Sequence, residues 1–246
     1  MSPFSAPVFC AIDMVDVSRA RGIVTAVAEV VAGIKVGLEF FHANGAKGVH
    51  AVREAGGTLP MFLDLKFHDI PTTVAGAVRG VMPLQPFMID VHASGGRAMM
   101  EAAAAACAEE AEKAGVKRPL VVAVTVLTSL DSSSMAEVGV AAASVADQVM
   151  RLASLAQACG LDGVVCSAHE VRRLRAGCGP GFRLVVPGVR PVWADNHEQK
   201  RVLTPTEALA AGADLLVIGR PMTAAPDPAA AARRITREIV EAQRCV

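Results

Sequence analysis

The stretch Met61-Phe62-Leu63-Asp64-Leu65-Lys66-Phe67-His68-Asp69-Ile70-Pro71 combines a short apolar run with several charged side chains. Its first five residues, Met61–Leu65, are predicted to form a buried strand, because short apolar runs bounded by polar residues are typical of one. A helical pattern follows at Thr72–Arg79. The stretch therefore predicts a strand followed by a helix, with charged residues near the end of the strand.

The same alternation continues along the chain. Eight apolar runs are predicted as strands buried on both faces: Phe9–Asp13, Gly33–Val36, Met61–Leu65, Phe87–His92, Leu120–Val126, Gly163–Cys166, Arg183–Val186 and Leu215–Ile218. The helical patterns are Val17–Val31, Glu39–Ala55, Thr72–Arg79, Gly96–Ala114, Ser144–Cys159, Ala168–Arg175, Thr206–Ala211 and Pro228–Arg244, with Ser18 and Thr206 as predicted N-caps. This count predicts an α/β protein with the (β/α)₈ TIM barrel fold, in a single domain over residues 1–246.

A doubly wound open sheet uses the same alternation of strands and helices. That fold would place a glycine-rich nucleotide loop after the first strand. The sequence there is Asp13-Met14-Val15-Asp16, which contains no glycine. The barrel is therefore favoured over the open sheet.

Composition excludes several classes of protein. The 246 residues are 52% apolar, which excludes disorder, and 24 Lys+Arg balance 24 Asp+Glu, which argues against binding to nucleic acid. The start of the chain lacks a signal-peptide pattern, and the longest apolar stretch, Pro119–Leu130, is too short to span a bilayer. The six cysteines show no C-x-x-C spacing and are expected to be buried thiols. We expect a cytoplasmic protein with no membrane partner.

Charged residues gather near the carboxyl ends of the first three predicted strands. Asp64 and Lys66 are two residues apart, so they are expected on the same side of a strand. Lys35 lies in an apolar strand, where it needs a nearby anion to keep its proton. Such an array can hold a protonated lysine beside carboxylates, ready to meet a developing carbanion. Its predicted members are Asp13, Lys35, Asp64, Lys66 and Asp69.

An anion site is predicted at the other end of the chain. Gly188-Val189-Arg190-Pro191 follows the seventh strand and Gly219-Arg220-Pro221 follows the eighth. Barrels often bind phosphate with these two loops, and arginine offers a planar fork of donors. Two connections, Leu127–Ala143 and Pro187–Pro205, are long enough to be functional loops over the same rim.

These motifs together resemble the orotidine 5′-phosphate decarboxylase family from end to end. The resemblance rests on Ala11-Ile12-Asp13, Ile34-Lys35-Val36-Gly37, the Asp64-x-Lys66-x-x-Asp69-Ile70-Pro71-x-Thr73 block, Val91-His92-Ala93-Ser94-Gly95-Gly96, Val126-Leu127-Thr128-Ser129, Pro187-Gly188-Val189-Arg190-Pro191, Gln199-Lys200-Arg201 and Val217-Ile218-Gly219-Arg220-Pro221. It implies a homodimer that decarboxylates orotidine 5′-phosphate to uridine 5′-phosphate, in pyrimidine biosynthesis, with no cofactor and no metal.

The resemblance also implies a role for each matching residue. Lys66 would donate a proton to C6, Asp64 would lie by the departing carboxylate, and Lys35 would bond within the array and to ribose. Asp69, Ile70 and Thr73 would come from the partner subunit, so that the active sites are shared. The remaining substrate-binding residues would be Asp13 for ribose, Thr128 and Ser129 over the pyrimidine, Gln199 between base and phosphate, and Arg190, Gly219 and Arg220 at the phosphate.

Two other interpretations remain open. Magnesium-dependent sugar-phosphate lyases share the Asp-x-Lys-x-x-Asp block, but they have an acidic residue where this chain has Lys35, which would repel a metal ion. A non-catalytic barrel that binds phosphate ligands gives no reason for the charged array. Asp90 is charged where the resemblance leads us to expect a neutral residue, and its role is not assigned.

Overall fold

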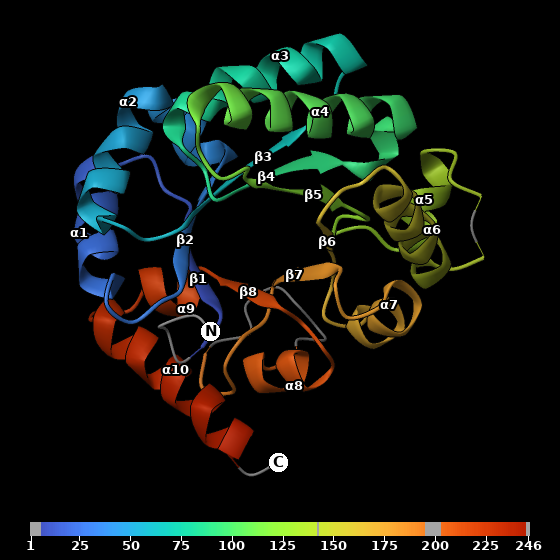
Figure 1. Ribbon diagram of the computed structural model, residues 1–246. Coiled ribbons are helices and arrows are strands. Elements are labelled where there is room, and N and C mark those ends of the chain that lie inside the picture. The colour runs from blue at the N-terminus through green and yellow to red at the C-terminus, as the bar shows by residue number, and fades with distance from the viewer. Residues whose placement is uncertain (1–5, 142, 195–202, 245–246) are drawn as a thin grey trace.

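In the computed structural model the strands form a closed ring with the helices outside it (Figure 1). The structure describes residues 6–141, 143–194 and 203–244. All strand pairs are parallel, each strand pairs with the next, and β8 returns to β1. The (β/α)₈ barrel predicted from the alternation of strands and helices is therefore confirmed, and the open sheet is excluded.

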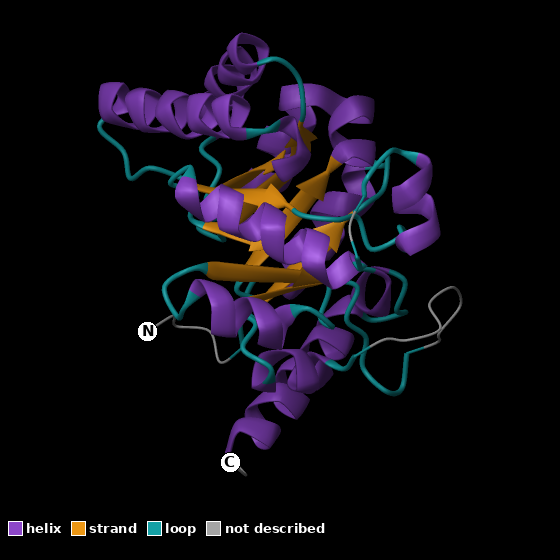
Figure 2. Cartoon of the chain, turned by 90° about the vertical axis from the view of Figure 1, so that its right-hand side faces the viewer, coloured by secondary structure: helices purple, strands orange, loops and turns teal. Residues whose placement is uncertain are grey.

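The strands lie close to their predicted positions. They are β1 Val8–Ile12, β2 Gly33–Gly37, β3 Met61–Phe67, β4 Met88–His92, β5 Leu120–Val124, β6 Gly163–Val165, β7 Arg183–Pro187 and β8 Leu215–Ile218. β3 continues two residues beyond its predicted end, and β5 stops two residues before it. The turned view in Figure 2 shows the strands enclosed by helices.

The helices match the predicted pattern except for two short additions. They are α1 Val17–Val27, α2 Leu38–Gly56, α3 Pro71–Val81, α4 Arg97–Ala114, α5 Ser132–Glu137, α6 Val145–Ala158, α7 Val171–Cys178, α8 Pro205–Ala210, α9 Arg220–Thr223 and α10 Pro228–Arg244, with 3₁₀ turns at Met82–Leu84 and Ala93–Gly95. The additions are α5, inside the long connection after β5, and α9, directly after β8. No helix in the described ranges is long and apolar enough to cross a membrane.

Both predicted N-caps are wrong by two residues. Asp16, not Ser18, accepts the N–H of Arg19 at the start of α1. Thr204, not Thr206, begins α8, where its side chain accepts the N–H of Glu207 while the Glu207 carboxylate accepts the N–H of Thr204. This reciprocal capping box satisfies two backbone donors at once, which a cap at Thr206 could not do.

The core has two layers, one inside the barrel and one between the strands and the helices. The inner layer consists of apolar side chains from six strands and from the residue before β2: Phe9, Ala11, Ala32, Phe62, Met88, Val122, Val185 and Val217. Gly33 makes room for this layer, because a Cβ there would lie 2.6 Å from the Phe9 ring and from the carbonyl oxygen of Pro60. The inner layer fills the barrel and forms a floor below the carboxyl ends of the strands.

Five of the six cysteines lie in the described residues, and all five are buried free thiols, as predicted. Cys245 lies outside the described residues. Unpaired buried thiols are typical of proteins in a reducing compartment.

Candidate active site

A cavity of about 520 Å³ opens above this floor, at the carboxyl ends of the strands. Its walls bring together residues that lie in or follow β1, β2, β3, β5, β6, β7 and β8. The predicted site residues that line it are Asp13, Lys35, Asp64, Lys66, Thr128, Arg190, Gly219 and Arg220. Strands far apart in sequence meet here because parallel strands of a barrel all end at one rim.

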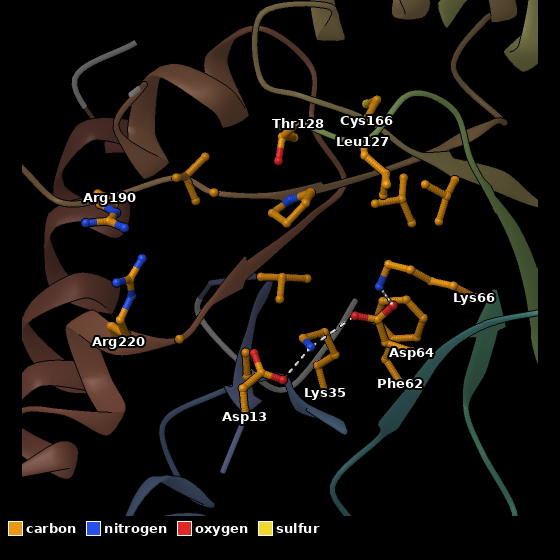
Figure 3. Close-up of a pocket in the computed structure, with 18 of the residues that line it drawn as sticks. Asp13, Lys35, Phe62, Asp64, Lys66, Leu127, Thr128, Cys166, Arg190 and Arg220 are labelled. Carbon is orange, nitrogen blue, oxygen red and sulfur yellow. Dashed lines mark hydrogen bonds and ion pairs between the residues drawn. The ribbon is translucent and has the colours of Figure 1, made fainter. Parts of the chain in front are cut away.

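Four of these side chains form a continuous chain of alternating charge (Figure 3). The Lys35 Nζ atom lies 2.9 Å from Asp13 Oδ1 and 3.0 Å from Asp64 Oδ2. The other oxygen of Asp64 accepts from the Nζ atom of Lys66. Asp64 thus bridges the two lysines, and Lys35 bridges the two carboxylates. We call this set the charge array: Asp13, Lys35, Asp64 and Lys66.

The charges of the array are stabilised by one another. Burial alone would lower the pKa of Lys35, but Asp64 and Asp13 outweigh it and raise the pKa above its ordinary value. Burial would raise the pKa of Asp64, but Lys35, a hydrogen bond with Asp90 and the charge of Lys66 lower it to about 2. Both groups are therefore charged at neutral pH, although both side chains are nearly buried.

Gly37 allows the array to close. A Cβ atom at this position would lie 2.7 Å from Asp13 Oδ1 and 2.8 Å from Lys35 Nζ. Real Cβ atoms do not come so close to such atoms, so a side chain here would force Asp13 Oδ1 or Lys35 Nζ to move. Gly37 is also the last residue of β2, and α2 begins immediately after it.

A β-bulge places Lys66. Leu63 pairs with Ile89 and Phe67 with Val91, so β3 holds extra residues where β4 is regular. Lys66 lies in this irregularity with a φ of 50°, a left-handed conformation that is uncommon outside glycine. Asp64 and Lys66 meet as predicted, but through the bulge rather than through regular strand alternation.

Two arginines line another wall of the cavity. Figure 3 shows the guanidinium groups of Arg190 and Arg220 turned toward each other, across the cavity from Lys66. Arg190 follows β7, and its backbone N–H donates to the carbonyl oxygen of Leu203 at 3.2 Å. Gly188, with a φ of 75°, turns the chain just before it. Such a pair of planar cations suits a phosphate group.

Comparisons with known proteins identify the family. The family model described as "Orotidine 5'-phosphate decarboxylase / HUMPS family" matches residues 6–235. The chain belongs to the orotidine 5′-phosphate decarboxylase / HUMPS family. The resemblance seen in the sequence motifs is confirmed.

Relatives that bear the decarboxylase name are similar to this chain over nearly their whole length. "Orotidine 5'-phosphate decarboxylase" of Rhodospirillum rubrum is 59% identical, over 95% of this chain and 94% of that protein. The protein of that name from Paramagnetospirillum magneticum is 53% identical, over 95% and 98%. The crystal structure of orotidine 5′-phosphate decarboxylase from Lactobacillus acidophilus matches with a TM-score of 0.81 at 34% identity, covering 95% of this chain and 99% of that one. The chain is accordingly an enzyme of this decarboxylase family.

Four of the remaining predicted residues do not line the cavity, and Asp69, predicted as a member of the charged array, does not join it within this chain. Asp69, Ile70 and Thr73 are exposed at the loop before α3 and in its first turn, and Asp69 Oδ1 accepts the N–H of Ile70 at 2.6 Å. Ser129 is exposed next to Thr128 but does not line the cavity. Gln199 lies outside the described residues.

The structure adds residues that the sequence analysis missed. Glu39 lines the cavity from the first turn of α2, two residues after β2 ends, and that position was the signal for it. Phe62 and Cys166 contribute apolar wall, and burial raises the pKa of the Cys166 thiol, which keeps it neutral. Within the described ranges no three His, Cys, Asp or Glu side chains gather as a metal site would require.

Proposed function

We propose that the protein decarboxylates orotidine 5′-phosphate to uridine 5′-phosphate in pyrimidine biosynthesis, without a metal or a cofactor. The observation that carries this proposal is the charge array, which presents the ammonium group of Lys66 to the same cavity as Arg190 and Arg220. The names of the relatives support the choice of substrate. The cytoplasm is the proposed location, and the buried free thiols fit it.

Lys66 supplies the proton in this mechanism. Breaking the bond between C6 and the carboxylate releases carbon dioxide and leaves an electron pair in the plane of the pyrimidine ring. That pair has no π-system to enter, so the site must stabilise it with a nearby cation. The Nζ atom of Lys66 provides the charge and then transfers a proton to C6, after which the neutral amine takes a proton from water.

The other members of the array hold Lys66 and the sugar. Asp64 binds both lysines and keeps Lys66 oriented toward C6, beside the departing carboxylate. Lys35 and Asp13 lie at the other end of the array, where Asp13 is half exposed and available to a ribose hydroxyl. Preorganised charges of this kind need little rearrangement as the reaction proceeds.

The arginine pair holds the phosphate far from the bond that breaks. Arg190, Arg220 and Gly219 bind the phosphate oxygens, Thr128 and Ser129 cover the base, and Gln199 bridges base and phosphate. Binding energy from a remote group can be used to orient the reacting group, which raises the rate of the chemical step.

Each site is completed by a second subunit in this proposal. Asp69, Ile70 and Thr73 are exposed, and Ile70 retains 64% of its accessible surface, a large value for an apolar side chain. The proposed homodimer covers Ile70 and brings Asp69 to the charge array of the neighbour.

Replacing Lys66 with alanine tests the reaction. We expect Lys66→Ala to lower turnover of orotidine 5′-phosphate more than a hundredfold, because a positioned proton donor contributes roughly 10²–10⁴-fold. Affinity for uridine 5′-phosphate should change little. Lys47→Ala, at an exposed lysine of α2, is the control and should keep full activity.

The same assay after dialysis against EDTA tests whether the reaction needs a metal ion. Wild-type activity should survive it, because Lys35 lies between the carboxylates that a divalent cation would need. A loss of activity restored by magnesium would contradict the proposal. Lack of turnover by the wild-type protein would overturn the proposed function itself.

A further inference from the structure

A carboxyl group that the proposed reaction does not use lies directly below the charge array. Asp90 is the central residue of β4 and is 0% exposed. It pairs with Val122 of β5, and its side chain lies on the same inward face of β4 as Met88, part of the inner core layer. A charged side chain is almost never buried this completely unless it is paired.

The two oxygens of Asp90 differ. Oδ1 accepts the backbone N–H of Lys66 at 2.9 Å. Oδ2 is buried with no hydrogen-bond donor among the described residues. The Asp90 carboxyl group interacts with the Asp64 carboxyl group, which is itself only an acceptor when ionised. Only a proton on one of the two carboxyls can turn this contact into a hydrogen bond.

The charges around Asp90 decide which carboxyl carries that proton. Asp64 must be ionised, because it bridges Lys35 and Lys66. With Asp13, the array then has two carboxylates and two ammonium groups, which balance. A charged Asp90 would add an unbalanced anion in a buried place, next to Asp64.

We propose that Asp90 is a neutral carboxylic acid that positions Lys66: its Oδ2–H donates to Asp64, and its Oδ1 holds the backbone N–H of Lys66. The first bond keeps Asp64 turned toward the two lysines. The second fixes the bulge of β3, where Lys66 has a left-handed backbone. Asp90 touches no substrate atom and acts through Lys66. The part of this inference that concerns Lys66 chemistry rests on the proposed function.

The surroundings of Asp90 favour the protonated form. Burial, and after it the charge of Asp64, raise the pKa of Asp90 well above its usual range, against the opposing effect of Lys66. β5 presents only apolar Val122 opposite it. His92, two residues further along β4, adds no positive charge at neutral pH, because burial lowers its pKa.

Two variants of Asp90 distinguish the hydrogen bonds that position Lys66 from a negative charge on Asp90. In Asp90→Asn the amide N–H₂ can donate to Asp64 and the amide oxygen can accept from Lys66, so we expect kcat within about threefold of wild type, less than the effect of losing one hydrogen bond to a charged group. In Asp90→Leu both bonds are lost. There kcat should fall by about ten- to a hundredfold with KM changed much less, because the arginine pair is untouched. A loss in Asp90→Asn equal to that in Asp90→Leu would overturn the proposal.

A measurement of protein stability against pH tests whether Asp90 is protonated, and it needs no substrate. A carboxyl that holds its proton in the folded state stabilises that state below its unfolded pKa of 3.8, and this stabilisation is lost as the pH rises toward the folded pKa. The unfolding constant of wild type relative to Asp90→Asn should therefore rise about tenfold per pH unit in that interval. Asp227→Asn, at an exposed residue that accepts the N–H of Ala230, is the control, and its ratio should not rise with pH. A flat ratio for Asp90→Asn would show that Asp90 is ionised.

Infrared spectroscopy of the wild-type protein avoids variants altogether. At neutral pH the spectrum should contain the carbonyl stretching band of a protonated carboxylic acid. This band should shift when the aspartates of the protein are labelled with ¹³C. Its absence would overturn the proposal. Because the infrared and unfolding experiments need no substrate, they can succeed while the wild-type protein fails to turn over orotidine 5′-phosphate, so a failure of the proposed function is seen separately.

Discussion

Contacts of the backbone fix the position of Lys66 as much as contacts of its side chain do. Its Nζ atom reaches Asp64, its N–H reaches Asp90, and its φ of 50° is possible because β3 bulges at this point. The charges at the ends of β1, β2 and β3 were predictable from the sequence, since parallel strands in a barrel end at one rim. The bulge was not predictable, because it depends on how β3 pairs with β4.

Arg220 gives a prediction at the scale of one residue. Replacing it with alanine should weaken binding of uridine 5′-phosphate about tenfold or more, because a hydrogen bond to a charged group contributes ~1.5–3 kcal/mol. Binding of uridine, which lacks the phosphate, should change little. Isothermal titration of both ligands provides the measurement. Arg233→Ala, on exposed α10 surface, serves as the control. Equal losses for both ligands would place Arg220 away from the phosphate.

The connection between β7 and α8 is tied to the barrel at the element scale. The indole N–H of Trp193 donates to Glu238 of α10 at 2.9 Å, and the guanidinium of Arg234 lies 4.3 Å from the centre of the indole ring. On the cavity side, the bond from Arg190 to Leu203 joins the two ends of the connection. The sequence marked this connection as a long functional loop, but its anchor on α10 could not be predicted, because the partners are 45 residues apart.

Removing the Trp193 anchor should loosen this connection. Trp193→Ala should speed hydrogen exchange in residues 188–194, since it loses both a charge-assisted hydrogen bond and a cation–π contact. Trp193→Phe keeps an aromatic ring and should show a smaller effect. Exchange followed by mass spectrometry measures both variants, with α4 as the internal reference. Unchanged rates in Trp193→Ala would mean that the contacts with α10 do not hold the connection.

The ends of elements show where sequence analysis falls short. The stretch Thr204-Pro205-Thr206-Glu207 carries the capping-box pattern that begins α8, and it could have been recognised by its Thr and Glu three residues apart. The two short helices α5 and α9 have too few residues for a periodic pattern. Their formation depends on contacts with the rest of the barrel, which one sequence does not reveal.

At the scale of the whole molecule, the proposed dimer makes the site depend on two chains. Asp69 is exposed outside its own cavity, while Lys66 lies inside it. Homodimers of Asp69→Ala and of Lys66→Ala should each be nearly inactive. Mixed dimers would hold one site free of both substitutions and one site with both.

Mixing the two variants therefore tests the shared site. With random exchange at equal amounts, about half of the dimers are mixed and each has one good site of two, so activity should approach about a quarter of wild type. Mass spectrometry must confirm that subunits have exchanged. No recovery after confirmed exchange would mean that Asp69 serves the site of its own subunit.

In the proposed reaction, the apolar layer inside the barrel also limits the path by which the products leave. Phe9, Phe62 and their neighbours fill the barrel below the charge array, so the cavity ends blindly at its floor. In that reaction, carbon dioxide released beside Lys66 could not leave through the filled interior of the barrel. It would have to pass the nucleotide and leave through the opening of the cavity beside Arg190 and Arg220. The gas and the nucleotide would then use the same opening, which is lined by residues that follow β5, β7 and β8.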